Sequence, residues 1–236
     1  MNGVFVTGTG TEVGKTVVAA VMAHTLAAEG KKVAVFKPVV TGLGPEPPAE
    51  GPISPQIGVF ETHRLAVLPD HELLRLAAAS RQSDDEIAPY RYGPPASPHL
   101  ASALAGEAID PARLRAAAHS AAAHADALVC EGVGGLLVPL RGDYLVRDLA
   151  VALGLPIVIA AAPGLGTINH TLLTIEAART AGLVVASVVL TPWPDEPSSV
   201  EQSNRETIEA LGEIRVLTLP EIDLDDPRSW PALALS

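Results

Sequence analysis

Residues 8–16 read Gly-Thr-Gly-Thr-Glu-Val-Gly-Lys-Thr and directly follow a short apolar run at residues 4–7. A strand that turns through glycines into a helix is the setting of a phosphate-binding loop, because backbone N–H groups converge there on phosphate oxygens. Lys15 can supply positive charge to the β- and γ-phosphates, and the hydroxyl of Thr16 can ligate Mg²⁺. The helix expected at residues 16–29 directs the positive end of its dipole at the same anion. This segment therefore predicts a nucleoside triphosphate site.

A second cation ends the next apolar run, at residues 33–38. This expected strand closes with Lys37 and Pro38, and the proline fixes the backbone just after the lysine. An ordinary surface lysine is one interpretation of Lys37. We favour a second phosphate-facing cation, because two lysines beside a γ-phosphate would neutralise the charge that shifts during phosphoryl transfer.

A carboxylate ends a third apolar run, at residues 127–131. Glu131 is followed by glycines at 132, 134 and 135, which permit a close approach of backbone to a ligand. A strand that delivers a carboxylate into a glycine turn is similar to the second acidic element of P-loop ATPases, where it completes a Mg²⁺ shell with the loop threonine. The alternative is a solvated loop glutamate. Cys130 has no evident base partner, so we expect a buried apolar residue rather than a nucleophile.

The elements that must position these residues alternate along the chain. We expect strands at residues 4–7, 33–38, 127–131, 157–161, 185–191 and 216–219. We expect helices at residues 16–29, 70–79, 111–125, 146–153, 167–181 and 198–211. Repeated alternation predicts an α/β fold of the P-loop NTPase type, with a doubly wound, mostly parallel sheet and helices on both faces. Ligands bind beyond the carboxyl ends of such strands.

Length and composition limit the function classes. The chain has 236 residues and a net charge of −11, which argues against general binding to nucleic acid or anionic membranes. One cysteine excludes an internal disulfide. The N-terminal residues show no secretory signal, and no apolar run reaches the roughly 18 residues of a membrane span. We expect a cytoplasmic protein.

A single domain is expected over residues 1–236, with one irregular part. Residues 42–58 are rich in proline and glycine and lack periodicity. A mobile surface insertion is the favoured interpretation, and a lid over the active site is the alternative.

Five ordered motifs carry a family resemblance. They read T-G-T-x-T-E-V-G-K-T, K-P-V-x-T/S-G, S-P-H, E-G-x-G-G and L-G-x-I-N-H, at residues 7–16, 37–42, 97–99, 131–135 and 165–170. In this order they resemble the dethiobiotin synthetases. The loop, in which five residues rather than the usual four separate Gly8 from Gly14, and the Lys-Pro-Val element are the most specific of them.

The resemblance implies an ATP- and Mg²⁺-dependent ligase of biotin biosynthesis. In that reaction CO₂ adds to an amine of 7,8-diaminononanoate, the carbamate attacks the γ-phosphate, and the second amine closes the cyclic urea. A carbamate is already a nucleophile, so catalysis would consist of positioning and charge stabilisation by Lys15, Lys37 and Mg²⁺. Two other classes stay open: a P-loop switch ATPase that positions cargo, and another amide-forming ligase of cofactor biosynthesis.

The family's motifs also imply roles for individual residues. Lys37, Lys15 and Thr11 would be catalytic, and Thr11, Lys37, Thr41 and Asn169 would contact the diamine or its carbamate. Thr16, Asp70 and Glu131 would hold the metal ion, with Glu61 as the competitor of Asp70. Asn169 would meet the substrate carboxylate across a dimer interface, which implies a homodimer.

The nucleotide would be bound by the loop and by the ends of three strands. The implied residues are Glu12, Val13, Gly14, Lys15, Thr16, Val17, Asp70, Glu131, Gly132, Val133, Gly134, Thr191, Pro192, Pro220, Glu221 and Ile222. Gly10 replaces an aspartate of many relatives, a change that phosphate binding tolerates. Relatives often place Asn-Asp after the fifth strand to recognise adenine, but this chain has Thr191-Pro192-Trp193. Main-chain contacts at residues 220–222, or stacking on Trp193, could take over that role.

Two histidines lie within the family motifs. The spacing of His99 and His170 suits no catalytic triad, so we expect structural or hydrogen-bonding roles for both. His119 and His124, on an alanine-rich helix, are expected at the surface.

Overall fold

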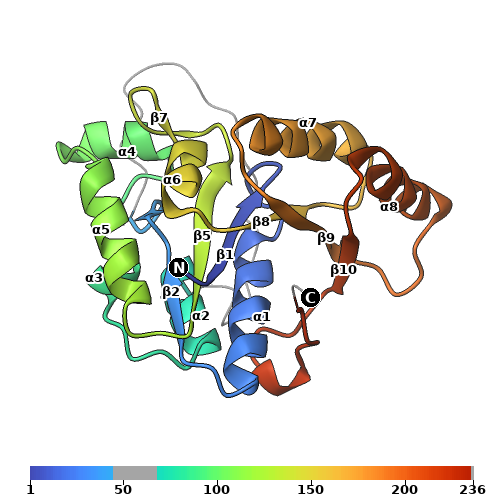
Figure 1. Ribbon diagram of the computed structural model, residues 1–236, viewed down its shortest axis with the longest axis horizontal. Helices are drawn as coiled ribbons and strands as arrows, with labels where there is room; N and C mark the ends of the chain where they lie inside the picture. The colour runs from blue at the N-terminus through green and yellow to red at the C-terminus, as the bar shows by residue number, and fades with distance from the viewer. Residues whose placement is uncertain (45–67, 235–236) are drawn as a thin grey trace.

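Six strands form the central sheet of the structure, a computed structural model that describes residues 1–44 and 68–234 (Figure 1). Each strand pairs in parallel with its neighbours in the order β10-β9-β8-β1-β5-β2. The strands are Gly3–Gly8 (β1), Val33–Phe36 (β2), Ala127–Gly135 (β5), Ile157–Ala161 (β8), Val185–Trp193 (β9) and Val216–Pro220 (β10). The predicted α/β fold with a parallel sheet is confirmed.

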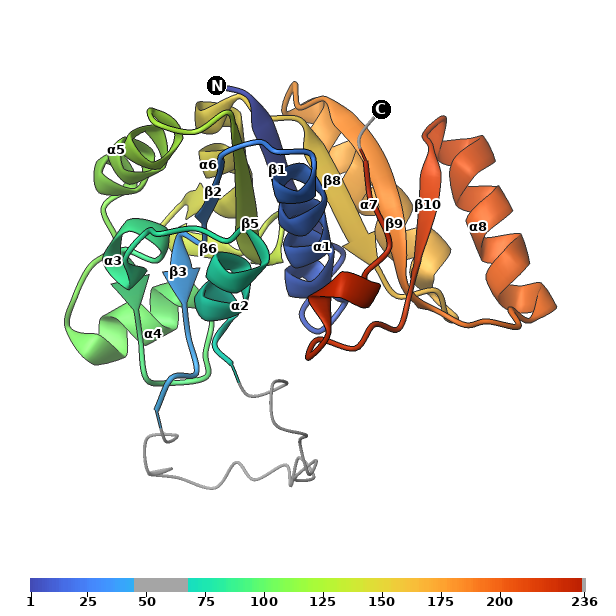
Figure 2. The ribbon, with the colours of Figure 1, turned by 90° about the horizontal axis from the view of Figure 1, so that it is seen from below.

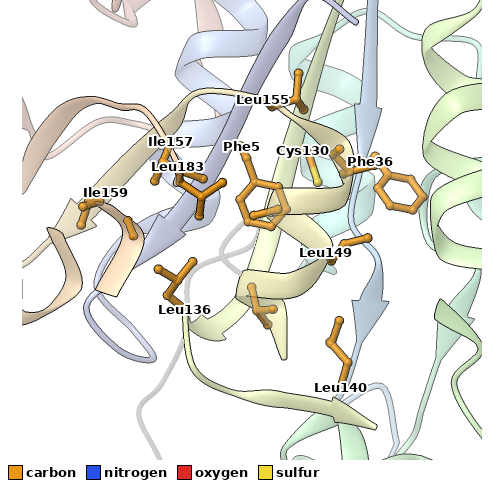
Figure 3. Packing of buried hydrophobic residues seen from close by; sticks show 14 of the residues in the cluster. Phe5, Phe36, Cys130, Leu136, Leu140, Leu149, Leu155, Ile157, Ile159 and Leu183 are labelled. Carbon is orange, nitrogen blue, oxygen red and sulfur yellow. The ribbon is translucent and has the colours of Figure 1, made fainter. Parts of the chain in front are cut away.

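The continuous apolar strands bury both faces of this sheet. On β1, Phe5 belongs to one hydrophobic cluster, whereas Val4 and Val6 belong to the other. Figure 3 shows the first cluster, where Phe5, Phe36 and Cys130 pack close to Leu149. Cys130 is fully buried and its burial raises its pKa well above the ordinary value, so it is the apolar residue that we expected.

Helices cover the two clusters from opposite sides (Figure 2). The first cluster is covered by Pro111–Ala122 (α5), Val146–Leu153 (α6), Thr167–Thr180 (α7) and Ser199–Gly212 (α8). The second is covered by Lys15–Ala28 (α1), Asp70–Ala77 (α2) and the C-terminal segment with Trp230 and Leu233.

Several short elements were not predicted from the sequence. They are the paired strands Val39–Val40 (β3) and Tyr90–Arg91 (β4), the paired strands Pro139–Arg141 (β6) and Tyr144–Leu145 (β7), the helices Asp84–Ile87 (α3) and Pro98–Ala105 (α4), and the 3-10 turn Pro227–Ser229 (η1). All of them except α4 span four residues or fewer, too few for a hydrophobic periodicity to stand out in the sequence.

Several predicted boundaries need correction. The strand that we expected at residues 33–38 ends at Phe36, so Lys37 follows it directly. The strand expected at 127–131 continues to Gly135, which pairs with Gly8 of β1 after a shift in register. The strand expected at 185–191 continues through Pro192 to Trp193. The helices expected to end at 79 and 125 end at Ala77 and Ala122.

Two further sequence predictions concern the proline-rich segment and membrane spans. Most of the proline-rich segment, residues 45–58, lies outside the described residues, as does Glu61. Among residues 1–44 and 68–234, none of the helices combines the length and apolar character needed to cross a membrane.

Candidate functional site

The predicted phosphate loop joins β1 to α1. Gly14 is the N-cap of α1 and adopts the left-handed conformation with φ 83°, which glycine reaches without steric cost. Lys15 is buried, and its Nζ donates a hydrogen bond to the carbonyl of Gly10 at 2.7 Å. The lysine therefore closes over the loop, where its charge faces the space that phosphate oxygens would occupy.

The strand order brings Lys37 and Glu131 beside this loop. The strand β5 lies between β1 and β2, so the residues at the carboxyl ends of all three strands meet. Lys37 Nζ lies 2.5 Å from Glu131 Oε1 and 2.7 Å from Asp70 Oδ2. The side chains predicted from separate motifs thus form one ionic network.

The loop threonine joins the same network. Thr16 Oγ1 donates to Glu131 Oε1 at 2.8 Å. Asp70 enters from the first residue of α2, which packs on α1. Three oxygen-bearing side chains, Thr16, Asp70 and Glu131, therefore gather around Lys37.

Burial and charge act in opposite directions on this network. Burial disfavours the ammonium of Lys37, but the carboxylates of Glu131 and Asp70 outweigh it, and the pKa of Lys37 rises above its ordinary value. The pKa of Lys15 is lowered, chiefly by burial and then by the charge of Lys37. Burial also opposes the charge of Asp70, yet the attraction of Lys37 lowers its pKa.

Glu131 is the fully buried acid of the group. Its burial raises its pKa, and the neighbouring Lys37 only partly counters this effect. Its Oε2 atom is buried without a hydrogen-bond partner among the described residues. A buried carboxylate oxygen without a partner is costly unless a cation or donor reaches it.

These donors fit a magnesium ion. Carboxylate and hydroxyl oxygens are the hard ligands that Mg²⁺ takes, usually together with phosphates and water. Within the described residues there is no group of three or more His, Cys, Asp or Glu side chains that could hold a metal by itself. Such a donor set fits an ion that shares its ligands with nucleotide phosphates.

Many of the predicted site residues line one cleft of about 380 Å³. Its lining consists of Thr11, Glu12, Gly14, Lys15, Thr16, Val17, Lys37, Val39, Thr41, Asp70, Glu131, Val133 and Gly134. Val39 was missed as a site residue, although it belongs to the Lys-Pro-Val motif. Val13 lies within the same loop but is absent from this lining.

A second cavity of about 450 Å³ adjoins the loop on its other side. It is lined by Gly8, Thr9, Gly10, Thr11, Gly135, Leu136, Leu137, Val138, His170, Leu173, Thr174 and Ala177. Its apolar residues carried no chemical signal in the sequence, so they were missed. His170 lines this cavity, whereas Asn169 lies exposed in the first turn of α7 and lines neither cavity.

The remaining predicted residues lie around the loop. Gly132 is buried, and an added Cβ would lie 3.0 Å from the ring of Phe5, so its lack of a side chain serves packing. A Cβ on Gly14 would lie 2.4 Å from Thr191 Cγ2, which places the buried Thr191 against the phosphate loop. Pro192, exposed, follows Thr191 at the end of β9.

The segment after β10 lies next to the end of β9. Pro220 pairs with Trp193, so residues 220–222 begin beside the strand end that contacts Gly14. Glu221 is exposed and Ile222 is half-buried. His99, in contrast, is exposed on α4 and lines neither cavity. His119 on α5 and His124 just after it are also exposed, and neither lines these cavities.

Comparison with known proteins shows the family of this chain. A family model described as an AAA domain matches residues 2–228. An ATP-dependent dethiobiotin synthetase of Anaeromyxobacter dehalogenans is 41% identical over 200 residues, which cover 84% of this chain and 81% of that protein. The same enzyme of Bacillus subtilis is 34% identical over 217 residues, with 92% and 86% covered.

The chain belongs to the dethiobiotin synthetase family. This synthetase family member also resembles solved structures, in fold alone. A ParA family ATPase of Chlorobium tepidum aligns with a TM-score of 0.55 at 14% identity, over 96% of this chain and 89% of that one. The cell division ATPase MinD of Pyrococcus furiosus aligns with a TM-score of 0.50 at 16% identity, over 94% and 84%.

Proposed function

We propose that the chain is an ATP-dependent dethiobiotin synthetase that carboxylates 7,8-diaminononanoate with CO₂ and closes its ureido ring. The observation that supports this most directly is the contact of Lys37 with Glu131 and Asp70 beside the phosphate loop. Membership of the synthetase family supplies the reaction class.

The reaction needs no general base from the protein. An amine of the substrate adds to CO₂, giving a carbamate and a proton. A carbamate oxygen attacks the γ-phosphorus of ATP, and ADP leaves. The second amine then attacks the carbonyl carbon of the mixed anhydride, and phosphate departs with the bond to that carbon broken. The described lining of the cleft carries no histidine or cysteine, which fits a nucleophile that is already ionised.

Lys15 and Lys37 supply the positive charge that this sequence of steps needs. Both are buried, so their charges act in a medium of low polarity where electrostatic stabilisation is strong. Lys15 would hold the β- and γ-phosphates. Lys37 would face the γ-phosphate and the carbamate, with Thr11 and Thr41 positioning the diamine from the rim of the same cleft.

Thr16, Asp70 and Glu131 would hold Mg²⁺. When bound, the ion neutralises phosphate charge and orients the phosphate oxygens. The buried Glu131 Oε2 without a partner supports this assignment, and so does the position of Asp70 at the start of α2 in the cleft.

The active form is proposed to be a homodimer in the cytoplasm. The second cavity is flanked by Leu137 and Leu173, whose side chains are 54% and 56% exposed. Contiguous exposed apolar patches are typical of interaction sites, and these two leucines line the same cavity. A second copy would cover them, and Asn169 at the N-terminal turn of α7 would reach the substrate carboxylate of the other subunit.

ATP is the proposed nucleotide, and its base would be bound without a dedicated amide side chain. The Thr191 side chain packs on Gly14, which leaves main-chain groups of Pro192, Pro220, Glu221 and Ile222 to contact the base. Trp193, half-buried beside Pro220, offers a stacking surface.

Phosphate release tests the proposal. The full chain is incubated with ATP, Mg²⁺, bicarbonate and 7,8-diaminononanoate, and phosphate and the cyclic urea are measured together. We expect both products, and neither when the diamine is omitted. Phosphate release that is unchanged without the diamine, with no cyclic urea, would instead indicate a switch ATPase. Parallel reactions with CTP and GTP measure the preference for the base.

A further inference from the structure

The chain after β10 turns back along α1. Ile222 and Leu224 pack against the hydrophobic cluster on the α1 side of the sheet, and Trp230 and Leu233 belong to that cluster. Figure 2 shows this segment, with η1, running beside α1. The C-terminal segment thus joins the edge strand β10 to the helix that begins at the phosphate loop.

Trp230 makes three contacts that fix this segment: one ring contact with α1 and two hydrogen bonds within the segment. Its ring is 7% exposed and lies edge-on to His24 of α1, with ring centroids 5.4 Å apart. Its Nε1 donates to the carbonyl of Asp223 at 2.7 Å. Its backbone N–H donates to Pro227 at 3.2 Å, which closes η1. One side chain therefore links α1 directly to Asp223.

Asp223 follows the residues that are proposed to contact the nucleotide base. Since Pro220 pairs with Trp193 and Thr191 packs on Gly14, residues 220–222 begin at the side of the phosphate loop. The Trp230–Asp223 hydrogen bond fixes the other end of this short segment. The segment is thereby held at both ends before a ligand binds.

We infer that Trp230 is a positioning residue for the nucleoside half of the nucleotide. It holds residues 220–222 at a set position relative to α1, so that base and phosphates meet one preorganised site. This inference rests on the proposed binding of ATP. Without the indole, the segment would have to be ordered at the moment of binding, which reduces affinity.

Leu233 provides a matched control. It is buried in the same cluster to the same 7% exposure as Trp230, and its backbone N–H donates to Thr25 Oγ1 at 3.0 Å. Leu233 lies on the far side of Trp230 from Asp223 along the chain. A Leu233→Ala change removes apolar contacts of the tail but leaves the link between α1 and Asp223.

The experiment compares two ligands on the full chain by calorimetry. ATP contacts both halves of the site, whereas inorganic tripolyphosphate contacts the phosphate loop alone. We expect Trp230→Ala to weaken ATP binding about tenfold, the order of one lost buried hydrogen bond, and to leave tripolyphosphate binding unchanged. We expect Trp230→Phe, which keeps an aromatic ring but lacks the donor, to weaken ATP binding by a few-fold. Leu233→Ala should lower Tm and change neither affinity.

Several results would overturn the inference. Equal losses for ATP and tripolyphosphate in the Trp230 variants would indicate general damage to the loop. No loss, or the same loss in Leu233→Ala, would remove the specific role of Trp230. If Trp230→Ala does not fold, Trp230→Phe decides. A wild-type chain that binds tripolyphosphate as tightly as ATP would also overturn it, while a wild type that binds neither would reject the proposed function itself.

Discussion

Lys37 is buried beside two carboxylate neighbours. Its Nζ lies within 2.7 Å of an oxygen of both Glu131 and Asp70, so its charge is balanced before any ligand enters. A nucleotide with Mg²⁺ would compete for the same carboxylates. With an ion held by these carboxylates, the charge of Lys37 would be available to the γ-phosphate and the carbamate. The charge of Lys37 would then stabilise the transition state more than the ground state.

Replacement of Lys37 by alanine tests this role. We expect Lys37→Ala to lower kcat for dethiobiotin formation at least about a hundredfold, the usual cost of losing a preorganised electrostatic group. The variant should remain folded by circular dichroism. The exposed Lys32, changed to alanine in parallel, should leave kcat unaltered. Near-normal turnover of Lys37→Ala would remove Lys37 from the mechanism.

We expect Lys15 to make nucleotide affinity fall at alkaline pH. Burial and Lys37 lower its pKa below the ordinary 10.5 in the free protein, and bound phosphate would raise it again. Binding above the lowered pKa must therefore take up a proton, so ATP affinity should fall as pH rises through that value. Titration calorimetry from pH 8 to pH 10 measures the decline.

A variant separates Lys15 from other alkaline effects. Arginine stays charged throughout this range, so Lys15→Arg should bind ATP with an affinity that is flat between pH 8 and pH 10, even if it is weaker overall. The same decline in both proteins would assign the pH dependence to another group.

At the scale of elements, β9 packs against the phosphate loop at Gly14, the residue that precedes α1. Gly14 needs a positive φ, and an added Cβ would lie 2.4 Å from Thr191 Cγ2. Gly14→Ala should therefore strain the backbone by about 1 kcal/mol and also collide with Thr191. We expect it to weaken ATP binding strongly, as measured by calorimetry.

The double variant distinguishes the two causes. In Gly14→Ala with Thr191→Ala the collision is gone but the strain in φ remains, so part of the lost affinity should return. Thr191→Ala alone should reduce affinity only slightly. If the double variant binds no better than Gly14→Ala, the contact between β9 and the loop does not determine nucleotide binding.

The long elements could be predicted from the sequence because their signals are local. Each strand of the sheet contains a short apolar run. The helix α5 is preceded by Asp110, an N-cap whose side chain accepts from the backbone N–H of Ala112, and begins at Pro111. The paired strands β3 and β4 could not be predicted, because two-residue strands are defined only by a distant partner.

In the site, too, residues with a local sequence signal could be predicted, and those that depend on tertiary packing could not. Lys37 and Glu131 stand out because each ends an apolar run, and parallel strands bring such ends together. Thr16 stands out because it follows Gly-Lys in the phosphate loop. The second cavity depends on how α7 lies over Leu136–Val138, and apolar residues give no sign of that arrangement. The burial of Thr191 against Gly14 likewise depends on tertiary packing between segments far apart in the chain.

At the scale of the whole molecule, the second cavity predicts self-association. Leu173 lies on α7 with its side chain largely exposed at this cavity. Burying a glutamate there would place an unpaired charge in the interface. Sedimentation analysis should therefore show a dimer for the wild type and a monomer for Leu173→Glu.

Val184 provides the control for this experiment. It is 69% exposed just before β9, at the amino ends of the parallel strands, whereas the site lies at their carboxyl ends. Val184→Glu should stay dimeric and active. A wild type that sediments as a monomer, or a Leu173→Glu variant that remains a dimer, would contradict the proposed interface.

The fate of oxygen from bicarbonate tests ring closure through a phosphorylated carbamate most directly. With [¹⁸O]bicarbonate and unlabelled ATP, the carbamate carries two labelled oxygens, one of which attacks the γ-phosphorus. Mass spectrometry on a short reaction should find one ¹⁸O in the released phosphate and one in the carbonyl of the cyclic urea. Phosphate without ¹⁸O would mean that water, not the carbamate, attacks ATP, and would contradict the proposed reaction.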